Sequence, residues 1–135
     1  MEVTLEEFFA ASPERVFAAW TDPALVGQWF GCGPGRLWTV HVWECRTGGA
    51  LRVSMEMNGQ RFEVDGEFYE VTPAERIRYR FGTETVEVEF RPENKRTNLR
   101  LTHRRIPTAE DCGIRKGGWT YCLRTSLEGF LEGHA

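Results

Sequence analysis

The stretch RIRYRFGTETVEVEF, residues 76–90, decides the fold because its side chains alternate along two consecutive segments. In residues 76–81 apolar side chains interleave with three arginines, and in residues 84–90 they interleave mainly with glutamates. An alternation with a period of two is typical of strands that bury one face. The stretch therefore predicts two antiparallel strands with a common buried face. Arginines and glutamates would pair across the exposed face, so the charges need no acidic or basic partner.

Further segments with strand character lie on both sides of this hairpin. Turn residues separate most of them, at 47–49, 58–59, 72–75 and 92–95. Six consecutive antiparallel strands are expected, or seven with the first segment, which is expected to be an edge strand. The predicted strands are Val3–Phe9, Trp38–Cys45, Leu51–Met57, Arg61–Val71, Arg76–Phe81, Glu84–Phe90 and Thr97–Arg104.

Two short helices are predicted between the first two strands. Ser12 precedes Pro13, an arrangement typical of a helix start, and apolar residues follow at near-helical spacing up to Trp20. The sequence Thr21-Asp22-Pro23 ends this helix and caps a second one, whose apolar residues are Leu25, Val26, Trp29 and Phe30. The glycines and proline of residues 31–35 end regular structure there.

The last quarter of the chain predicts one long helix over Gly113–Glu132. Trp119, Leu123, Leu127 and Phe130 lie on one stripe of it, and charged residues lie elsewhere. A helix of this length spans nearly 30 Å at about 1.5 Å per residue, enough to cross the predicted sheet. The fold class is therefore α+β, in a single domain over residues 1–135.

Composition and charge exclude several classes of function. The chain has 17 basic and 20 acidic residues and no concentrated basic segment, so no nucleic-acid partner is expected. No run approaches the ~18 apolar residues of a membrane span, so no membrane contact is expected. The opening residues MEVTLEEFFA lack the features of a signal peptide, which favours a cytoplasmic protein.

Cysteine spacing gives no sign of a metal site. Cys32, Cys45, Cys112 and Cys122 form no CxxC pair and have no histidine at ligand spacing. We expect four partly buried thiols and neither a metal nor a cofactor. The pair Gly48-Gly49 predicts a hairpin turn, because it lacks the helix and the Lys-Ser/Thr pair of a phosphate loop.

Several motifs, taken in order along the chain, resemble the SRPBCC or START-like superfamily. The branch they resemble is the bacterial one similar to the activator of the ninety-kilodalton heat-shock-protein ATPase (AHSA1-like). Two departures lie in the turn where the family usually has Asp-x-Arg-Pro-Gly-Gly: Glu44 replaces Asp and Thr47 replaces Pro. The matching segments are ASPERVF at 11–17, TDP at 21–23 with Trp29, ECRTGG at 44–49, GEFYEVTPAERI at 66–77, TNLRLTH at 97–103 and Gly118-Trp119.

The resemblance implies a helix-grip fold, in which a curved antiparallel sheet wraps a long C-terminal helix around a cavity. It does not imply one function, because members include lipid and polyketide carriers, cyclases and co-chaperone domains. Inward strand residues and the inner stripe of the helix would line such a cavity. The predicted ligand-binding residues are Phe68, Tyr79, Phe81, Phe90, Leu101, His103, Trp119, Leu123 and Ser126.

Three hypotheses follow for the function. The first is a binding module for a small hydrophobic or aromatic molecule, oriented by Tyr79, His103 or Ser126. The second is a polyketide cyclase-like enzyme in which His103 or Tyr79 shuttles a proton. No nucleophile motif accompanies His103, so a hydrogen-bonded histidine at the cavity rim is favoured and no catalytic residue is assigned. The third is an interaction domain for a chaperone or another protein. The edge strand at Val3–Phe9 also makes a homodimer an open expectation.

Overall fold

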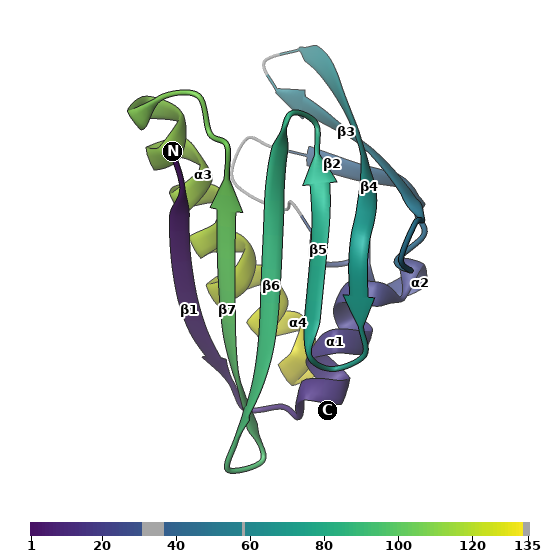
Figure 1. The fold of residues 1–135 in the computed structure, drawn as a ribbon, viewed down its shortest axis with the longest axis vertical. Helices are drawn as coiled ribbons and strands as arrows, with labels where there is room; N and C mark the ends of the chain where they lie inside the picture. The colour runs from purple at the N-terminus through teal and green to yellow at the C-terminus, as the bar shows by residue number, and fades with distance from the viewer. Residues whose placement is uncertain (31–36, 58, 134–135) are drawn as a thin grey trace.

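Seven strands form one antiparallel sheet in the order β1-β7-β6-β5-β4-β3-β2, and the helices lie on its concave side (Figure 1). The structure is a computed structural model that describes residues 1–30, 37–57 and 59–133. The elements are β1 (Val3–Phe9), α1 (Pro13–Thr21), α2 (Pro23–Val26), β2 (Leu37–Trp43), β3 (Ala50–Met57), β4 (Gln60–Thr72), β5 (Arg76–Phe81), β6 (Glu84–Glu93), β7 (Arg96–Arg104), α3 (Ala109–Tyr121), η1 (Cys122–Leu127) and α4 (Glu128–Gly133). The predicted α+β helix-grip arrangement is confirmed, with β1 at the sheet edge.

The hairpin of β5 and β6 has the register that its alternation predicts. Tyr79 pairs with Val86 on the buried face, and Arg78 pairs with Glu87 on the opposite face. Ion pairs join neighbouring strands on that outer face, such as Arg78 with Glu70 at 3.0 Å and Arg104 with Glu87 at 3.3 Å. The outer charges therefore neutralise one another in solvent, as expected from their spacing.

Strand β4 gives the sheet its curvature. It is 13 residues long and pairs with β3 along its first part and with β5 along its second. At Gly66 the backbone passes so close to β5 that a Cβ atom would lie 1.8 Å from the carbonyl oxygen of Arg80. Only glycine fits this contact, and the register shifts between Phe68 and Glu70. The sheet can therefore bend around the helices.

The two N-terminal helices begin as predicted, but the second is shorter than expected. The Ser12 hydroxyl accepts the Arg15 backbone N–H at 3.3 Å, and Asp22 Oδ1 accepts the Ala24 N–H at 2.9 Å. The prediction that Trp29 and Phe30 lie on α2 is wrong, because α2 ends at Val26. Both rings stay buried in the following turn, where the Trp29 indole N–H donates to the Ala19 carbonyl at 2.8 Å. The expected break at residues 31–35 lies outside the described residues.

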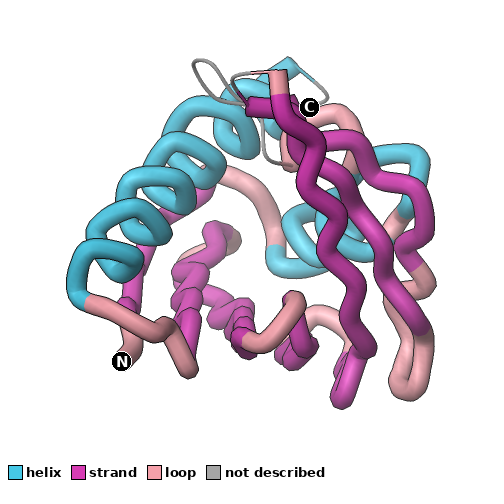
Figure 2. The backbone as a smooth tube through the Cα atoms, turned by 90° about the horizontal axis from the view of Figure 1, so that it is seen from above, coloured by secondary structure: helices cyan, strands magenta, loops and turns pink. Residues whose placement is uncertain are grey.

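The last helix crosses the concave side of the sheet, as Figure 2 shows. It begins at Ala109, four residues before the predicted start, because Thr108 caps it and its hydroxyl accepts the Asp111 N–H at 3.0 Å. Its middle part, Cys122–Leu127, is a π-helix, which the apolar stripe did not predict. Widened turns of this kind often occur at functional sites. The stripe residues Leu123 and Leu127 are fully buried there.

Candidate functional site

Aromatic rings from the sheet and from the helices meet between the two layers. The Trp119 ring of α3 stacks on the Trp20 ring of α1 with 6.1 Å between centroids. Trp43 of β2 lies 5.3 Å from Phe68 and 6.0 Å from Tyr79. We call this space the grip interior. Its walls are mainly apolar and aromatic, as the sequence predicts.

The nine predicted ligand-binding residues all come from the elements that bound the grip interior. Phe68, Tyr79, Leu101 and Leu123 are fully buried. Phe81 and Ser126 are half-buried. Phe90, His103 and Trp119 are buried and lie on β6, β7 and α3. Their role in binding stays a prediction, because no ligand contact tests it.

A polar cluster joins the sheet to the beginning of the last helix. His103 Nε2 lies 2.7 Å from Glu84 Oε1, and the Trp119 indole N–H donates to His103 Nδ1 at 2.9 Å. Arg115 holds the same carboxylate with two bonds, from Nε to Oε1 and from Nη2 to Oε2, each of 2.9 Å. We call Glu84, His103, Arg115 and Trp119 the Glu84 cluster.

The hydrogen bonds determine the protonation state of His103. An indole nitrogen only donates, so Nδ1 must be the unprotonated acceptor and Nε2 must carry the proton that points to Glu84. Burial lowers the pKa of His103, and the hydrogen bond to Glu84 opposes this effect. Burial acts to raise the pKa of Glu84, but the bonds and charge of Arg115 and the bond from His103 lower it overall. The resting cluster is therefore a neutral imidazole beside an ion pair.

This geometry leaves His103 without a free lone pair. Nδ1 accepts from Trp119, and Nε2 donates to Glu84. A general base needs an accessible nitrogen within hydrogen-bond distance of the substrate proton. The arrangement instead makes His103 a connection between the sheet and the last helix.

Sequence reasoning did not assign Glu84, Arg115, Trp20 or Trp43 to this interior. Glu84 lies two residues before Val86 and four before Val88, so the same alternation that buries these valines also turns Glu84 inward. Arg115 lies four residues before Trp119, on the same side of the helix. The strand alternation therefore placed Glu84 on the inward face, and the helical spacing placed Arg115 beside Trp119. A charged side chain is nevertheless rarely predicted on an apolar face unless its partner is known. Trp20 was identified only as a helix residue.

A second polar feature of the grip interior is the pair formed by Trp20 and Tyr79, which we call the Trp20–Tyr79 pair. Both side chains are fully buried. Within the part of the chain that the structure describes, neither Trp20 Nε1 nor the Tyr79 hydroxyl completes a hydrogen bond. Burial raises the pKa of Tyr79, as do Cys45 and Cys122 nearby, while a hydrogen-bonding interaction with the neighbouring Trp20 indole N–H acts to lower it. The two groups are thus close to each other but imperfectly aligned for bonding.

Three rings lead from the surface toward this pair. Trp38 of β2 and Phe81 of β5 are half-buried, and their centroids are 5.7 Å apart. Phe30 lies about equally far from both, at 6.0 and 6.2 Å, and 6.2 Å from Trp119. Phe81 in turn lies 6.4 Å from the Tyr79 ring. Phe30, Trp38 and Phe81 therefore form an aromatic rim over the grip interior.

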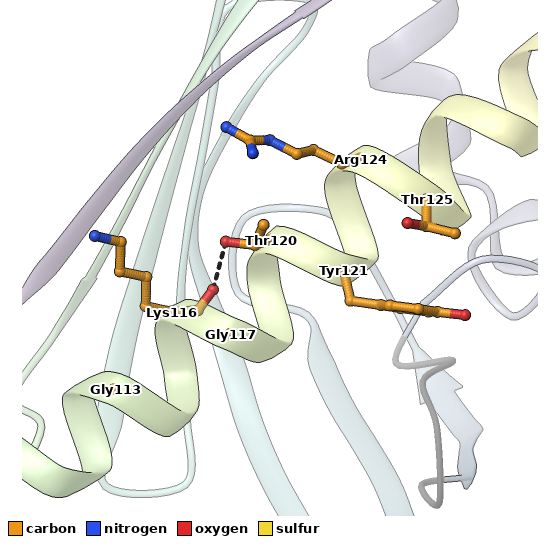
Figure 3. A pocket seen from close by; sticks show the side chains of 7 residues that line it. All are labelled: Gly113, Lys116, Gly117, Thr120, Tyr121, Arg124 and Thr125. Carbon is orange, nitrogen blue, oxygen red and sulfur yellow. Dashed lines mark hydrogen bonds between the residues drawn. The ribbon is translucent and has the colours of Figure 1, made fainter.

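Two hollows lie outside the grip interior, and neither is the cavity that was expected. One, of about 570 Å³, lies on the side of the last helix opposite Trp119, where Lys116, Tyr121 and Arg124 surround Gly113 and Gly117 (Figure 3). The other, of about 880 Å³, lies between the start of α1, the β4–β5 turn and the β6–β7 hairpin. Charged side chains such as those of Glu14, Arg76 and Lys95 line it. Each open hollow has a single aromatic residue in its lining, Tyr121 in the first and the predicted site residue Phe90 in the second.

Other chemistry is sparse in the described residues. No group of three or more His, Cys, Asp or Glu residues there could hold a metal ion. Cys45 and Cys112 are free thiols, and burial raises the pKa of Cys45 to about 12, whereas Cys32 lies outside the described residues. No described helix is both long and apolar enough for a membrane crossing. The described part of the chain thus leaves the grip interior as the most distinctive site.

Comparison with known proteins agrees with the geometry. A protein of Chromobacterium violaceum is 27% identical with a TM-score of 0.86, over 97% of this chain and 96% of that chain. The AHSA1 protein of Silicibacter pomeroyi is 27% identical with a TM-score of 0.85, over the full length of both chains. An AHSA1-like protein of Aeromonas hydrophila shares the fold at 20% identity and a TM-score of 0.81, over 99% and 94%. No curated protein matches. The model of the family called activator of Hsp90 ATPase homolog 1-like protein matches residues 10–132, and the chain belongs to this family.

Proposed function

We propose that this protein binds a small, uncharged, largely aromatic molecule in the grip interior, between the sheet and the last helix. The observation that carries the proposal is the continuous series of rings from the half-buried rim to the buried wall. Trp38 and Phe81 are accessible at the rim, and Tyr79 and Trp119 lie beneath them. Planar apolar ligands bind well between such rings, which prefer edge-to-face and offset contacts.

The chemistry of the wall favours a neutral guest. His103 is held neutral, and Arg115 is occupied by both oxygens of Glu84. An isolated charge moved from water into this apolar interior would lose its hydration and would find no free counter-charge on Arg115 or His103. The surrounding rings, in contrast, offer a large apolar area.

Entry of a guest requires the rim rings to move, because Phe30 and Trp119 already touch across the interior at 6.2 Å. Trp38 and Phe81 are half-buried, whereas Phe30 is buried, so the first two can change rotamer at lower cost than a fully buried ring. The π-helical segment is a second adjustable element, since its hydrogen-bond pattern differs from that of the helix on either side. Both features support a pocket that opens when a ligand binds.

The test is native mass spectrometry of the protein purified from its own cells. We expect a stoichiometric small-molecule adduct that disappears or weakens in the rim variant Trp38→Ala. The matched control is Phe8→Ala, because Phe8 is 50% exposed on β1, far from the rim in sequence, and faces away from the grip interior. A protein that carries no adduct and shows no saturable binding to a panel of planar aromatic compounds would contradict the proposal.

No second function has a specific observation behind it. A proton-shuttling enzyme would need a free nitrogen on His103, but both nitrogens are engaged. The alternative shuttle, Tyr79, keeps its proton, because burial raises the pKa of its phenol well above the ordinary value. A chaperone-binding surface would need a continuous apolar patch, whereas the large apolar side chains exposed in the described residues are divided among the N-terminus, β1, β4 and α3. The homodimer suggested by the edge strand stays a prediction that a measurement of mass in solution can test.

A further inference from the structure

We infer that the guest of the grip interior carries an uncharged hydrogen-bond acceptor, such as a ketone or amide carbonyl, which Trp20 Nε1 and the Tyr79 hydroxyl bind together. This inference rests on the proposed function and narrows it to a class of ligand. Its starting point is that both groups are fully buried and lack a completed hydrogen bond within residues 1–30, 37–57 and 59–133. A buried donor without a partner costs roughly 1–3 kcal/mol, so two adjacent ones are unusual.

The two polar groups lie close to each other, because the Trp20 indole N–H acts directly on the pKa of the Tyr79 hydroxyl. Trp43 packs beside both residues: its indole N–H donates to the backbone carbonyl of Trp20 at 2.8 Å, and its ring lies 6.0 Å from that of Tyr79. Trp20 comes from α1 and Tyr79 from β5, so the pair spans the interior from helix to sheet. A guest between these layers would meet both groups at once.

The donor types select the polar group of the ligand. An indole nitrogen can only donate, and a phenol can donate one hydrogen bond. A carbonyl oxygen has two lone pairs and can accept from both. A ligand that only donates would satisfy Tyr79 at most and would leave the Trp20 N–H without a partner. The pair therefore favours an acceptor over an amine or an aliphatic hydrocarbon.

Two other buried polar atoms lack a partner in the described part of the chain, Asn98 Oδ1 and Arg100 Nε, but they belong to a different face. Their residues alternate along β7 with the fully buried Leu99 and Leu101, so they stand on the convex side of the sheet. They do not line the grip interior. The inward, paired arrangement is specific to Trp20 and Tyr79.

The experiment uses three probes of the same ring system with titration calorimetry. 2-Acetylnaphthalene carries the acceptor, 2-isopropylnaphthalene has nearly the same shape without it, and 2-naphthoate is anionic. The readout is the dissociation constant of the isopropyl probe divided by that of the acetyl probe. This ratio cancels the contribution to affinity of the apolar contacts that the two probes share. We expect this ratio to fall about tenfold from the wild type to Tyr79→Phe, because one hydrogen bond is lost. We expect 2-naphthoate to bind at least about tenfold more weakly than the acetyl probe.

The control is Tyr69→Phe, which removes a hydroxyl from a tyrosine that is 43% exposed on β4 and should leave the ratio unchanged. Trp20→Phe provides a second test, because it removes the other donor and should lower the ratio as well. An unchanged ratio in both Tyr79→Phe and Trp20→Phe, or tighter binding of 2-naphthoate, would overturn the inference while leaving the proposed function in place. If neither neutral probe binds the wild type, the proposed function fails and the inference fails with it.

Discussion

The Glu84 cluster and the Trp20–Tyr79 pair lie in the same aromatic interior, but they differ in how their polar atoms are satisfied. In the cluster, both carboxylate oxygens, both imidazole nitrogens and the indole N–H have partners within 2.9 Å. In the pair, neither polar atom completes a bond to any described residue. A saturated cluster joins the sheet to the last helix, whereas an unsaturated pair leaves bonding capacity that the proposed ligand would use. The four predictions below test this division.

The largest effect is expected for Glu84→Gln. The amide would turn an NH₂ group toward Arg115 or His103, where the carboxylate now accepts three hydrogen bonds. Two donors would then face each other, and the charge of Arg115 would lose its partner. We expect the free energy of unfolding to fall by about 3 kcal/mol in urea denaturation. Glu67→Gln, an exposed glutamate on β4, is the control and should change little; an equal loss in both variants would contradict a structural role for the cluster.

A smaller loss is expected for Trp119→Phe. This change removes the N–H that donates to His103 Nδ1 and leaves a buried acceptor, which costs about 2 kcal/mol. It also frees Nδ1 to take up a proton, so the pKa of His103 should rise relative to the wild type. Histidine resonances followed by NMR during a pH titration measure this shift. A pKa of His103 that does not rise would show that the indole bond does not determine the protonation state.

The third prediction concerns the stability of the fold at low pH. The pKa of His103 is lowered in the fold, mainly by burial, so below its ordinary value of 6.5 the unfolded chain binds more protons than the folded one. The contribution of neutral His103 to the free energy of unfolding is therefore complete above about pH 6.5. It decreases as the pH falls, by at most about 1.4 kcal/mol per pH unit for one proton. The lowered pKa of Glu84 adds a further loss of the same sign below its ordinary value of 4.5. Urea midpoints at pH 7.5 and 5.5 should differ less in His103→Gln, and an equal difference would assign the acid sensitivity to other groups.

The smallest effect on stability is expected for Tyr79→Phe. Its hydroxyl is buried and completes no bond to the described residues, so its removal sacrifices no hydrogen bond. We expect the free energy of unfolding to change by less than about 0.5 kcal/mol, or to rise. Thermal and urea unfolding can measure this. A loss comparable with that of Trp119→Phe would mean that the hydroxyl has a structural partner, and the contrast between the two regions would disappear.

Much of the fold was predictable from local patterns. The period of two in residues 76–90 indicated the hairpin and its buried face, and the caps at Ser12 and Asp22 indicated both helix starts. The end of α2 was not predictable, because Trp29 and Phe30 continue an apolar spacing although they lie in a turn. The π-helical segment was not predictable either, since its side chains fit an ordinary stripe equally well.

The candidate site was predictable in composition but not in detail. The inward residues of the strands follow from alternation, and all nine predicted residues come from the elements that bound the interior. The partners of their polar atoms do not follow, because hydrogen bonds depend on the distances between elements far apart in the chain. Glu84 and Arg115, separated by 31 positions, illustrate this limit.

The amino-acid sequence by itself determined the class of the fold, the charged outer face and the aromatic inner face, because each depends on side chains a few positions apart. Only the tertiary structure decided which buried polar groups are paired and which are not. The indole of Trp119 meets His103, whereas the indole of Trp20 meets no aligned acceptor among the described residues. The physical reason is that a hydrogen bond needs two groups within about 3 Å, and no local sequence pattern determines the distance between the sheet and the helices.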